Sequence, residues 1–442
     1  GVSQTDLELE NIEAMLEGCK NLERHLENMK KFGFRDLMVF IILSATVAIA
    51  YQLPYLRFTF YDQMMAALHL NNTQIGVLAT AVNLVSTLSY PIGGVLASRF
   101  STRSMISVTL AAFVGLTVWY AFTTSYIMLI IIHVLYGFFG IATLWSAYLN
   151  GIRNLGTAEN QSTIFGSSEA TRGIVQTILG FSFLGVVGIA ATPAVGFRSL
   201  LLVGAAVTAV FFVLALIFLP KEEKQALESA EEEKYSLMDV LKNKGVWIMI
   251  FMIMGAFMTW SLGNGYLTTY TVQVLDISPS LASTLGIVRS YIIVFIAGFL
   301  GGWVLDRFTY KGKAIMLLLS VIFVSVLAVM LTSKVVPLCI GITLLIAFVA
   351  NVVKSTYWST MDQAGIPVKM TPMATGIISF IAFIPDFVVA PICGAWLDTA
   401  SATGNVAAGF TKIFIMIMSF AVLGIIFSFL LMKRTKQLEQ RG

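Results

Sequence analysis

Twelve apolar stretches dominate this sequence, and each is long enough to cross a lipid bilayer as a helix. A membrane-spanning helix needs about 20 mostly apolar residues. The stretches are 36–61, 74–98, 105–123, 126–150, 162–190, 198–219, 246–274, 281–305, 313–332, 336–361, 372–396 and 409–432. Only 12% of the residues are charged, whereas soluble domains average roughly 25%. The sequence therefore predicts an all-α, multi-pass integral membrane protein.

Basic residues are distributed unevenly between alternate loops. One set of loops carries many of them, including Arg153 and Lys313, while the alternate loops carry Arg198 and Lys334 alone. Lys and Arg accumulate in cytoplasmic loops of membrane proteins. We therefore expect both termini and the central loop to lie in the cytoplasm.

A highly charged segment after residue 219 separates six apolar stretches from the other six. Before the first stretch, apolar residues recur at three- and four-residue steps from Ile12 to Met29, which is the pattern of an amphipathic helix. The predicted parts are a cytoplasmic amphipathic N-terminal helix at 1–33, a six-helix bundle at 34–219, a cytoplasmic linker at 220–245, a second six-helix bundle at 246–432 and a cytoplasmic tail at 433–442.

One short phrase occurs twice. "GGVLASRF" begins at Gly93 and "GGWVLDRF" begins at Gly301, and each is followed by a further base, Arg103 or Lys311. Both copies fall at the cytoplasmic end of the second predicted helix of their half. Such an internal repeat indicates two pseudo-symmetric bundles, which is the design of a transporter with its site between the repeats.

These phrases resemble the helix 2–3 signature of the major facilitator superfamily, G-x-L-a-D-R-x-G-R-R, although Ser98 stands where the first copy should have its Asp. The resemblance implies twelve helices in two bundles, transport by alternating access, and a cytoplasmic latch that holds the bundles together. Alternatively, the bases of the motif only fix orientation. The implied latch residues are Gly94, Arg99, Arg103, Gly302, Asp306, Arg307 and Lys311.

Within that superfamily, the runs "YQLPYLRFTF" and "SSEATRGIVQTI" resemble the organophosphate and sugar-phosphate transporter branch. That resemblance implies that Arg57 grips an anion, although the stretch 246–274 lacks the base that the branch usually has there. Proton-coupled members carry an Arg where this chain has His133. That histidine could titrate near neutral pH, or it could be a packed residue with one hydrogen bond.

Six charged residues fall inside the predicted spans, away from the first and last four residues of each. A charge near the bilayer centre costs about 2.5–3.5 kcal/mol. The six are Arg57, Glu169, Arg172, Arg289, Lys354 and Asp386. Glu169 and Arg172 are three residues apart on one helical face, so they could neutralise each other, or Arg172 could exchange Glu169 for an anionic substrate. Asp386 follows Pro385 at an expected helix break and could pair with Lys354 or Arg289, whereas Lys354 could instead snorkel to the interface.

A surplus of buried bases suits an anionic substrate, because guanidinium groups bind carboxylate and phosphate in a bidentate manner. Arg289 is the base that the sequence favours most, since its flanks are apolar. The predicted substrate-binding residues are Gln52, Tyr55, Arg57, Arg172, Trp260, Asn264, Arg289, Lys354 and Tyr357. The predicted proton- or charge-coupling residues are His133, Glu169 and Asp386.

The sequence thus predicts a secondary-active transporter of a small organic anion, such as a sugar phosphate, carboxylate or sulfonate. We expect a monomer in a bacterial inner (plasma) membrane, coupled to a proton or a counter-anion. Two alternatives stay open: a proton symporter of an uncharged solute, and a membrane sensor that keeps the transporter fold. No phosphate-binding loop, metal cluster or nucleophile–base set is legible in the sequence. We therefore expect no cofactor, no metal, no nucleic-acid partner and no enzymatic activity.

Overall fold

The computed structural model describes residues 32–156, 161–221, 235–367 and 370–441. Within these ranges the regular structure is entirely helical, and twelve helices are long and apolar enough to cross a membrane. The predicted all-α architecture with twelve spans is confirmed. Residues 1–31 of the predicted N-terminal helix at 1–33 and residues 222–234 of the predicted linker at 220–245 lie outside the described residues.

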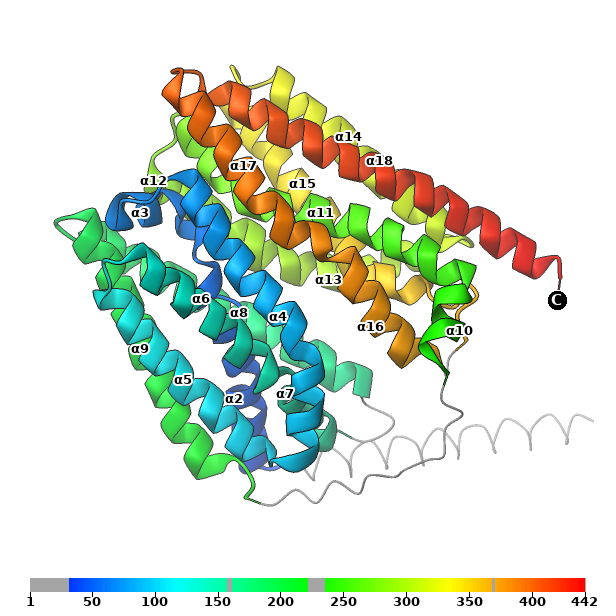
Figure 1. Ribbon diagram of the computed structural model, residues 1–442, viewed down its shortest axis with the longest axis horizontal. Helices are drawn as coiled ribbons and strands as arrows, with labels where there is room; N and C mark the ends of the chain where they lie inside the picture. The colour runs from blue at the N-terminus through cyan, green and yellow to red at the C-terminus, as the bar shows by residue number, and fades with distance from the viewer. Residues whose placement is uncertain (1–31, 157–160, 222–234, 368–369, 442) are drawn as a thin grey trace, which may run out of the picture.

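The helices before the linker form the first bundle (Figure 1). They are α2 (Phe34–Ala50), the 3-10 turn η1 (Leu53–Tyr55), α3 (Arg57–Leu68), α4 (Asn72–Arg99), α5 (Thr102–Phe122), α6 (Tyr126–Ala142), α7 (Trp145–Leu155), α8 (Gln161–Ile189) and α9 (Pro193–Phe218). The first span is therefore α2 followed by η1 and α3, and the fourth is α6 followed by α7.

The second bundle follows a short surface helix, α10 (Leu237–Lys242). Its elements are α11 (Lys244–Gln273), α12 (Pro279–Ile287), the π-helical turn η2 (Val288–Ile292), α13 (Ile293–Asp306), α14 (Lys311–Leu331), α15 (Val336–Thr356), the 3-10 turn η3 (Tyr357–Thr360), α16 (Thr371–Ala382), α17 (Ile384–Ala402) and α18 (Val406–Glu439). We call the membrane side that holds α10 and the end of α18 the linker side, and the opposite side the distal side.

Two breaks in the spans decide where the polar groups point. The first stretch was predicted as one helix over 36–61, but the chain leaves the α-helix after Ala50 and re-enters it at Arg57. Pro54 lies within this break and has no backbone N–H to continue the ladder. The eleventh span breaks at Phe383, beside Pro385, as the sequence predicted.

The distal side is closed by contacts between the bundles. The Asp398 carboxylate, on α17, accepts hydrogen bonds from the backbone N–H groups of Asn72 and Thr73 at 3.0 and 2.8 Å, and from both of their side chains. An anion in this position is favoured by the N-terminal end of the α4 dipole. On the neighbouring face, Gln63 of α3 donates to Ser283 of α12 at 2.8 Å.

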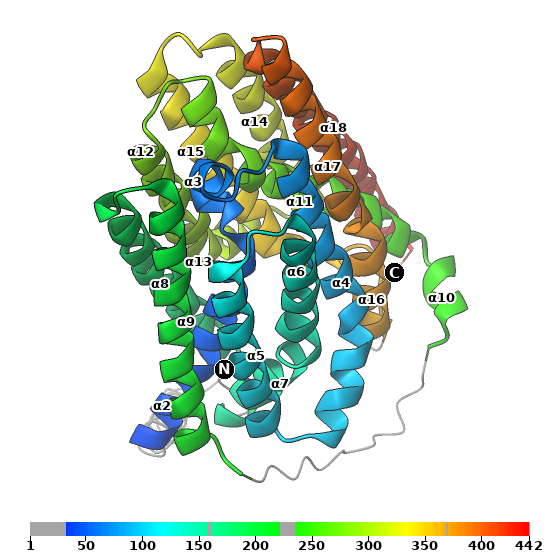
Figure 2. The same ribbon diagram turned by 60° about the vertical axis from the view of Figure 1, so that its left-hand side comes forward.

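On the linker side, the helices of the two bundles diverge (Figures 1 and 2). Hydrogen bonds between described residues here stay within a bundle, as when Arg35 donates to the Phe218 carbonyl and Lys311 to the Ser359 carbonyl. The arrangement is therefore closed at the distal side and open at the linker side.

We expect Gly394→Val to separate the bundles at the distal side, because a Cβ at this position would overlap the Asn72 backbone. Spin labels on cysteines at the exposed positions His69 and Ser401 should report a longer and broader distance distribution. The control is Gly376→Val, which faces open space in the same span and should leave the distribution unchanged. Equal distributions in both variants would contradict this account of the seam.

Candidate functional site

A cavity of about 390 Å³ lies between the two bundles. Its wall is built from Tyr51 and the elements η1, α3, α4, α6, α7 and α8 on one side, and from α11, η2, α13, α15, η3, Phe383 and α17 on the other. Tyr90, on the linker-side half of α4, lines it and is 44% exposed, so the cavity opens toward the linker side. Its volume is typical of a site for one small ligand.

Half of the lining residues are aromatic. Their rings follow one another across the seam: Trp145 meets Tyr51 at a centroid distance of 6.3 Å, Tyr51 stacks on Tyr55 at 6.4 Å, and Phe58 meets Trp260 at 6.3 Å. The contact between Phe58 and Trp260 joins the two bundles. Such a wall offers flat apolar faces for a ring-shaped ligand.

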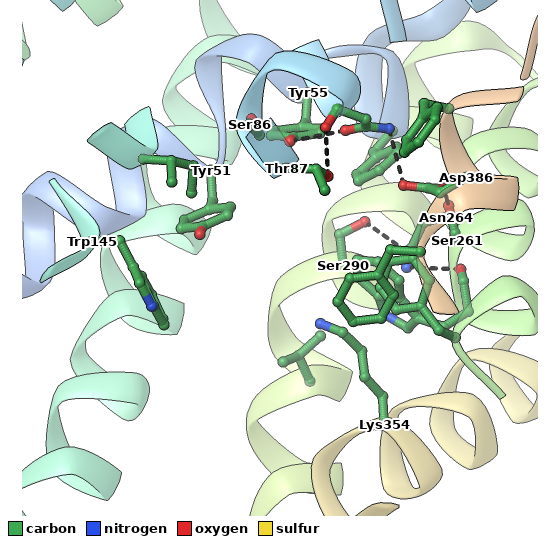
Figure 3. Close-up of a pocket in the computed structure, with 18 of the residues that line it drawn as sticks. Tyr51, Tyr55, Ser86, Thr87, Trp145, Ser261, Asn264, Ser290, Lys354 and Asp386 are labelled. Atoms are coloured by element: carbon green, nitrogen blue, oxygen red, sulfur yellow. Dashed lines mark hydrogen bonds between the residues drawn. The ribbon is translucent and has the colours of Figure 1, made fainter. Parts of the chain in front are cut away.

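Lys354 brings a positive charge into this aromatic cavity. Its ammonium group lies 3.8 Å from the centroid of the Trp260 ring, and no carboxylate of the described residues approaches within 4.0 Å. Asn351, one turn earlier on α15, accepts a hydrogen bond from the Trp260 indole at 3.0 Å and so fixes that ring. Figure 3 shows the Lys354 side chain reaching toward the aromatic rings in the middle of the site. It does not snorkel to the interface.

Asp386 lines the cavity and lies on the first turn of α17. Asn83, on α4 of the other bundle, donates to it at 3.0 Å, and Ser261 of α11 donates to its second oxygen. Tyr55 donates to the Asn83 side chain at 3.1 Å. The carboxylate thus bridges the bundles through uncharged donors (Figure 3), and it pairs with neither Lys354 nor Arg289.

Arg172 lies on α8 and lines the first-bundle wall. It forms an ion pair of 2.7 Å with Glu169, one turn earlier on the same helix. Glu169 does not line the cavity, and its side chain is 48% exposed. The pairing within one helix agrees with the alternative in which the two charges neutralise each other.

The structure brings most of the predicted residues to the cavity but not all. Those that line it are Tyr55, Arg172, Trp260, Asn264, Lys354, Tyr357 and Asp386. Those that lie outside its wall are Gln52, Arg57, His133, Glu169 and Arg289. The roles of both groups in binding and coupling stay predictions.

Arg57 and Arg289 are buried behind the wall, in the seam between the bundles. Arg57 is 6% exposed, and Gly265 leaves room for its guanidinium group, whose Nη1 atom would lie 3.1 Å from a Cβ there. Arg289 is 1% exposed and donates to the Thr268 hydroxyl at 2.9 Å. The break at η1 turns Arg57 toward α11, and the π-helical turn η2 presents Ser290 and Tyr291 to the cavity in place of Arg289.

His133 and Gln52 are also enclosed by protein. His133 lies inside the first bundle, where its ring meets Tyr120 at 5.4 Å and its Nδ1 atom lies 2.8 Å from the Leu129 carbonyl. This environment matches the alternative in which His133 is a packed residue with one hydrogen bond. Gln52 donates to the Gln176 carbonyl at 3.0 Å, so its amide supports the wall from behind.

The predicted latch residues do not join the bundles here. Arg307 lies 4.3 Å over the Trp303 ring and Lys311 donates to Ser359, both within the second bundle, while Arg103 donates to Leu216 within the first. The exposed Arg99 and Asp306 form no ion pair with a described residue. Gly94 and Gly302 face open space.

The close approach between helices is made instead by Gly93 and Gly301, which precede Gly94 and Gly302. A Cβ at Gly93 would lie 3.2 Å from the Ile141 carbonyl, and one at Gly301 would lie 2.7 Å from the Ser355 hydroxyl. The sequence pattern therefore located the packing site one residue too late.

Sequence reasoning missed several lining residues, above all Asn83 and Ser261, the partners of Asp386. An amide in the interior of the apolar stretch 74–98 was the available signal for Asn83, because an amide at that depth needs a hydrogen-bonding partner. Ser261 and Ser290 carried no such signal, since small hydroxyls in helices often bond their own backbone.

Several comparisons with known proteins agree with this architecture. The chain is 26% identical over 420 residues to the inner membrane protein YqcE of Escherichia coli K12, covering 92% of this chain and 97% of that protein. It is 25% identical over 408 residues to the inner membrane protein YihN of the same organism, covering 90% and 96%.

Among solved structures, a bacterial homolog of the human lysosomal transporter Spinster, in an inward-facing and occupied conformation, matches with a TM-score of 0.69 at 15% identity, covering 90% of this chain and 96% of that one. A D-xylose–proton symporter matches with a TM-score of 0.65 at 15% identity, covering 90% and 95%. The family model of the Major Facilitator Superfamily matches residues 37–390. This multi-pass membrane protein therefore belongs to the Major Facilitator Superfamily of transporters.

Proposed function

We propose that the protein is a secondary-active transporter that carries a small organic anion through the central cavity. The observation that carries this proposal is the position of Lys354: its ammonium group lines the cavity, stacks on Trp260 at 3.8 Å and has no carboxylate partner among the described residues. A negatively charged group of the cargo would supply that partner. Carboxylates, sulfonates and phosphates all have this chemistry.

The energetics of the membrane support this reading. A lysine near the bilayer centre costs about 2.5–3.5 kcal/mol, and stacking on an aromatic face returns about 0.5–2 kcal/mol. The remaining cost is offset by water in the open cavity. An anion on Lys354 replaces that water with a charge pair, which grows stronger when the cavity closes and its dielectric falls.

Alternating access would require the two sides of the molecule to open and close in turn. The distal seam is closed by Asp398 and its partners on α4, while the linker side is open. By the distribution of basic loop residues, the linker side is cytoplasmic and this conformation faces inward. In the outward-facing conformation, Asp398 would release α4, and the motif residues around Arg99 and Asp306 would latch the linker side.

We expect Lys354→Gln to abolish stabilisation of the purified protein by anions, because it removes the free cation of the cavity. The measurement is the apparent melting temperature in detergent with a panel of hexose phosphates, sugar acids and sulfonates, followed by counterflow in proteoliposomes. Lys354→Arg, which keeps the charge, should retain part of both signals. Lys412→Gln, at an exposed position of α18, should behave as the wild type.

Three results would count against the proposal. A wild-type protein that no anion stabilises would remove the substrate class. Ligand binding without flux would favour the membrane sensor. Loss of binding in an Arg289→Gln variant that leaves Lys354 intact would return the anion site to Arg289.

A proton symporter of an uncharged solute is the second candidate, and Asp386 is the observation that favours it. This carboxylate lines the cavity and is held by uncharged donors from both bundles. A proton on Asp386 would loosen the Asn83 contact that joins the bundles. The structural neighbour described as a D-xylose–proton symporter is consistent with this alternative.

We expect Asp386→Asn to keep counterflow of the bound anion, because it leaves Lys354 in place and removes a nearby negative charge. The measurement is exchange in proteoliposomes with and without an imposed pH gradient. If uptake of an uncharged solute is instead driven by the gradient in the wild type and lost in Asp386→Asn, the symporter is the correct function.

A further inference from the structure

We propose that Glu169 sets the charge of the cargo: by holding Arg172 in an ion pair, it leaves Lys354 as the free cation of the described cavity wall and selects singly charged organic anions with a ring. This inference rests on the proposed function, because it assumes that the cavity binds an anion. Glu169 acts as a positioning residue, since it acts through Arg172 and does not line the cavity.

The geometry of the pair supports this assignment. Arg172 and Glu169 are three residues apart on α8, and their charged atoms lie 2.7 Å apart. The Arg172 guanidinium lies 5.8 Å from the Tyr51 ring, at the cavity wall, whereas Glu169 is exposed beyond that wall. One of the two cavity bases is therefore neutralised by a residue that does not line the cavity.

The charged residues of the wall offer a dianion too few cationic partners. Of the lining residues, Lys354 and Arg172 are basic and Asp386 is acidic. With Arg172 paired to Glu169, a doubly charged cargo would set one of its charges against Lys354 and leave the second without a cationic partner, near the Asp386 carboxylate. Arg57 and Arg289 are buried and do not line the cavity. A monoanion meets Lys354 and adds no second charge.

The uncharged groups of the cavity wall indicate what the uncharged part of such a cargo would be. Tyr51 and Trp145 meet edge to face on the Arg172 side, and Trp260 lies under Lys354 on the other side. Ser86 and Ser290 add hydroxyls to the wall between them (Figure 3). A hydroxylated ring with one carboxylate or sulfonate matches both the aromatic faces and the hydrogen-bonding groups.

The test compares probes that share a ring and differ in charge. Purified protein at about pH 8, where a phosphate monoester carries close to two charges, is titrated with glucose, glucuronate and glucose 6-phosphate, and with 4-hydroxybenzoate and phenyl phosphate. The readout is the ratio of apparent Kd between the monoanion and the dianion of each ring. We expect the wild type to favour the monoanion.

Glu169→Gln frees Arg172, so it should improve binding of the dianion relative to the monoanion by about tenfold or more, as one charge-assisted hydrogen bond would. Glu169→Asp keeps the charge and should keep the wild-type ratio. The double variant Glu169→Gln, Arg172→Gln should return the ratio toward the wild type, because the freed base is gone. A purely structural role for Glu169 would lower all affinities together and leave the ratio unchanged.

The outcomes separate this inference from the proposed function. A wild type that favours dianions, or a ratio that Glu169→Gln leaves unchanged, overturns the role of Glu169 while anion transport stands. Stabilisation by glucose but by none of the anions overturns the anion-transport function itself.

Discussion

A base placed in the middle of a membrane has to find a partner, and four bases in this chain meet that constraint in three different ways. Arg172 pairs with a carboxylate on its own helix, and Lys354 lies over an indole ring in an open cavity. Arg57 and Arg289 are buried behind the cavity wall, the first over the Phe58 ring and the second donating to the Thr268 hydroxyl. An unpaired buried charge is far costlier than a paired one. Of the two bases that line the cavity, Arg172 has a carboxylate partner and Lys354 has none among the described residues.

The seam between the bundles is the second determinant. Its distal half includes one carboxylate, Asp398, set on the first turn of α4, the hydrogen bond from Gln63 to Ser283, and glycines that let α4 and α17 approach backbone to backbone. Contacts of this kind can be made and broken as a unit, because they join rigid helix ends and leave each bundle's core untouched. The cavity is lined by residues of both bundles, among them Asn83 and Asp386, which hydrogen-bond across the seam.

Family membership and cargo rest on different parts of the molecule. The fold is that of the Major Facilitator Superfamily, a scaffold on which many unrelated solutes are carried, so the choice of solute lies in the cavity wall. The resemblance to the organophosphate branch implies an anion-gripping base at Arg57, whereas the base that lines the cavity without a carboxylate partner among the described residues is Lys354. The aromatic cavity wall and the ion pair between Arg172 and Glu169 are the basis of our proposal that the cargo is a ring with a single charge rather than a phosphate dianion.

Much of this protein is readable from its sequence, because a bilayer leaves the backbone few options. Apolar length alone predicts twelve spans, the charged segment after residue 219 predicts the division, and Pro385 predicts the break before α17. Trp260, Asn264, Lys354 and Asp386 are also identifiable as polar or aromatic groups in apolar stretches. Each of these signals lies within one short segment of the chain, and the membrane acts on each segment separately.

Only the tertiary structure decides which charged group faces the cavity. Arg57 and Arg289 satisfy the same sequence criterion as Lys354, yet the break at η1 and the π-helical turn at η2 rotate them into the seam, and no helical periodicity reveals such a rotation. The partners of Asp386 come from α4 and α11, which are far from it in the chain. Burial and pairing depend on contacts between distant segments, whereas the number and length of the spans depend on composition. This is why the sequence determines the architecture but leaves to the packing which base lines the cavity.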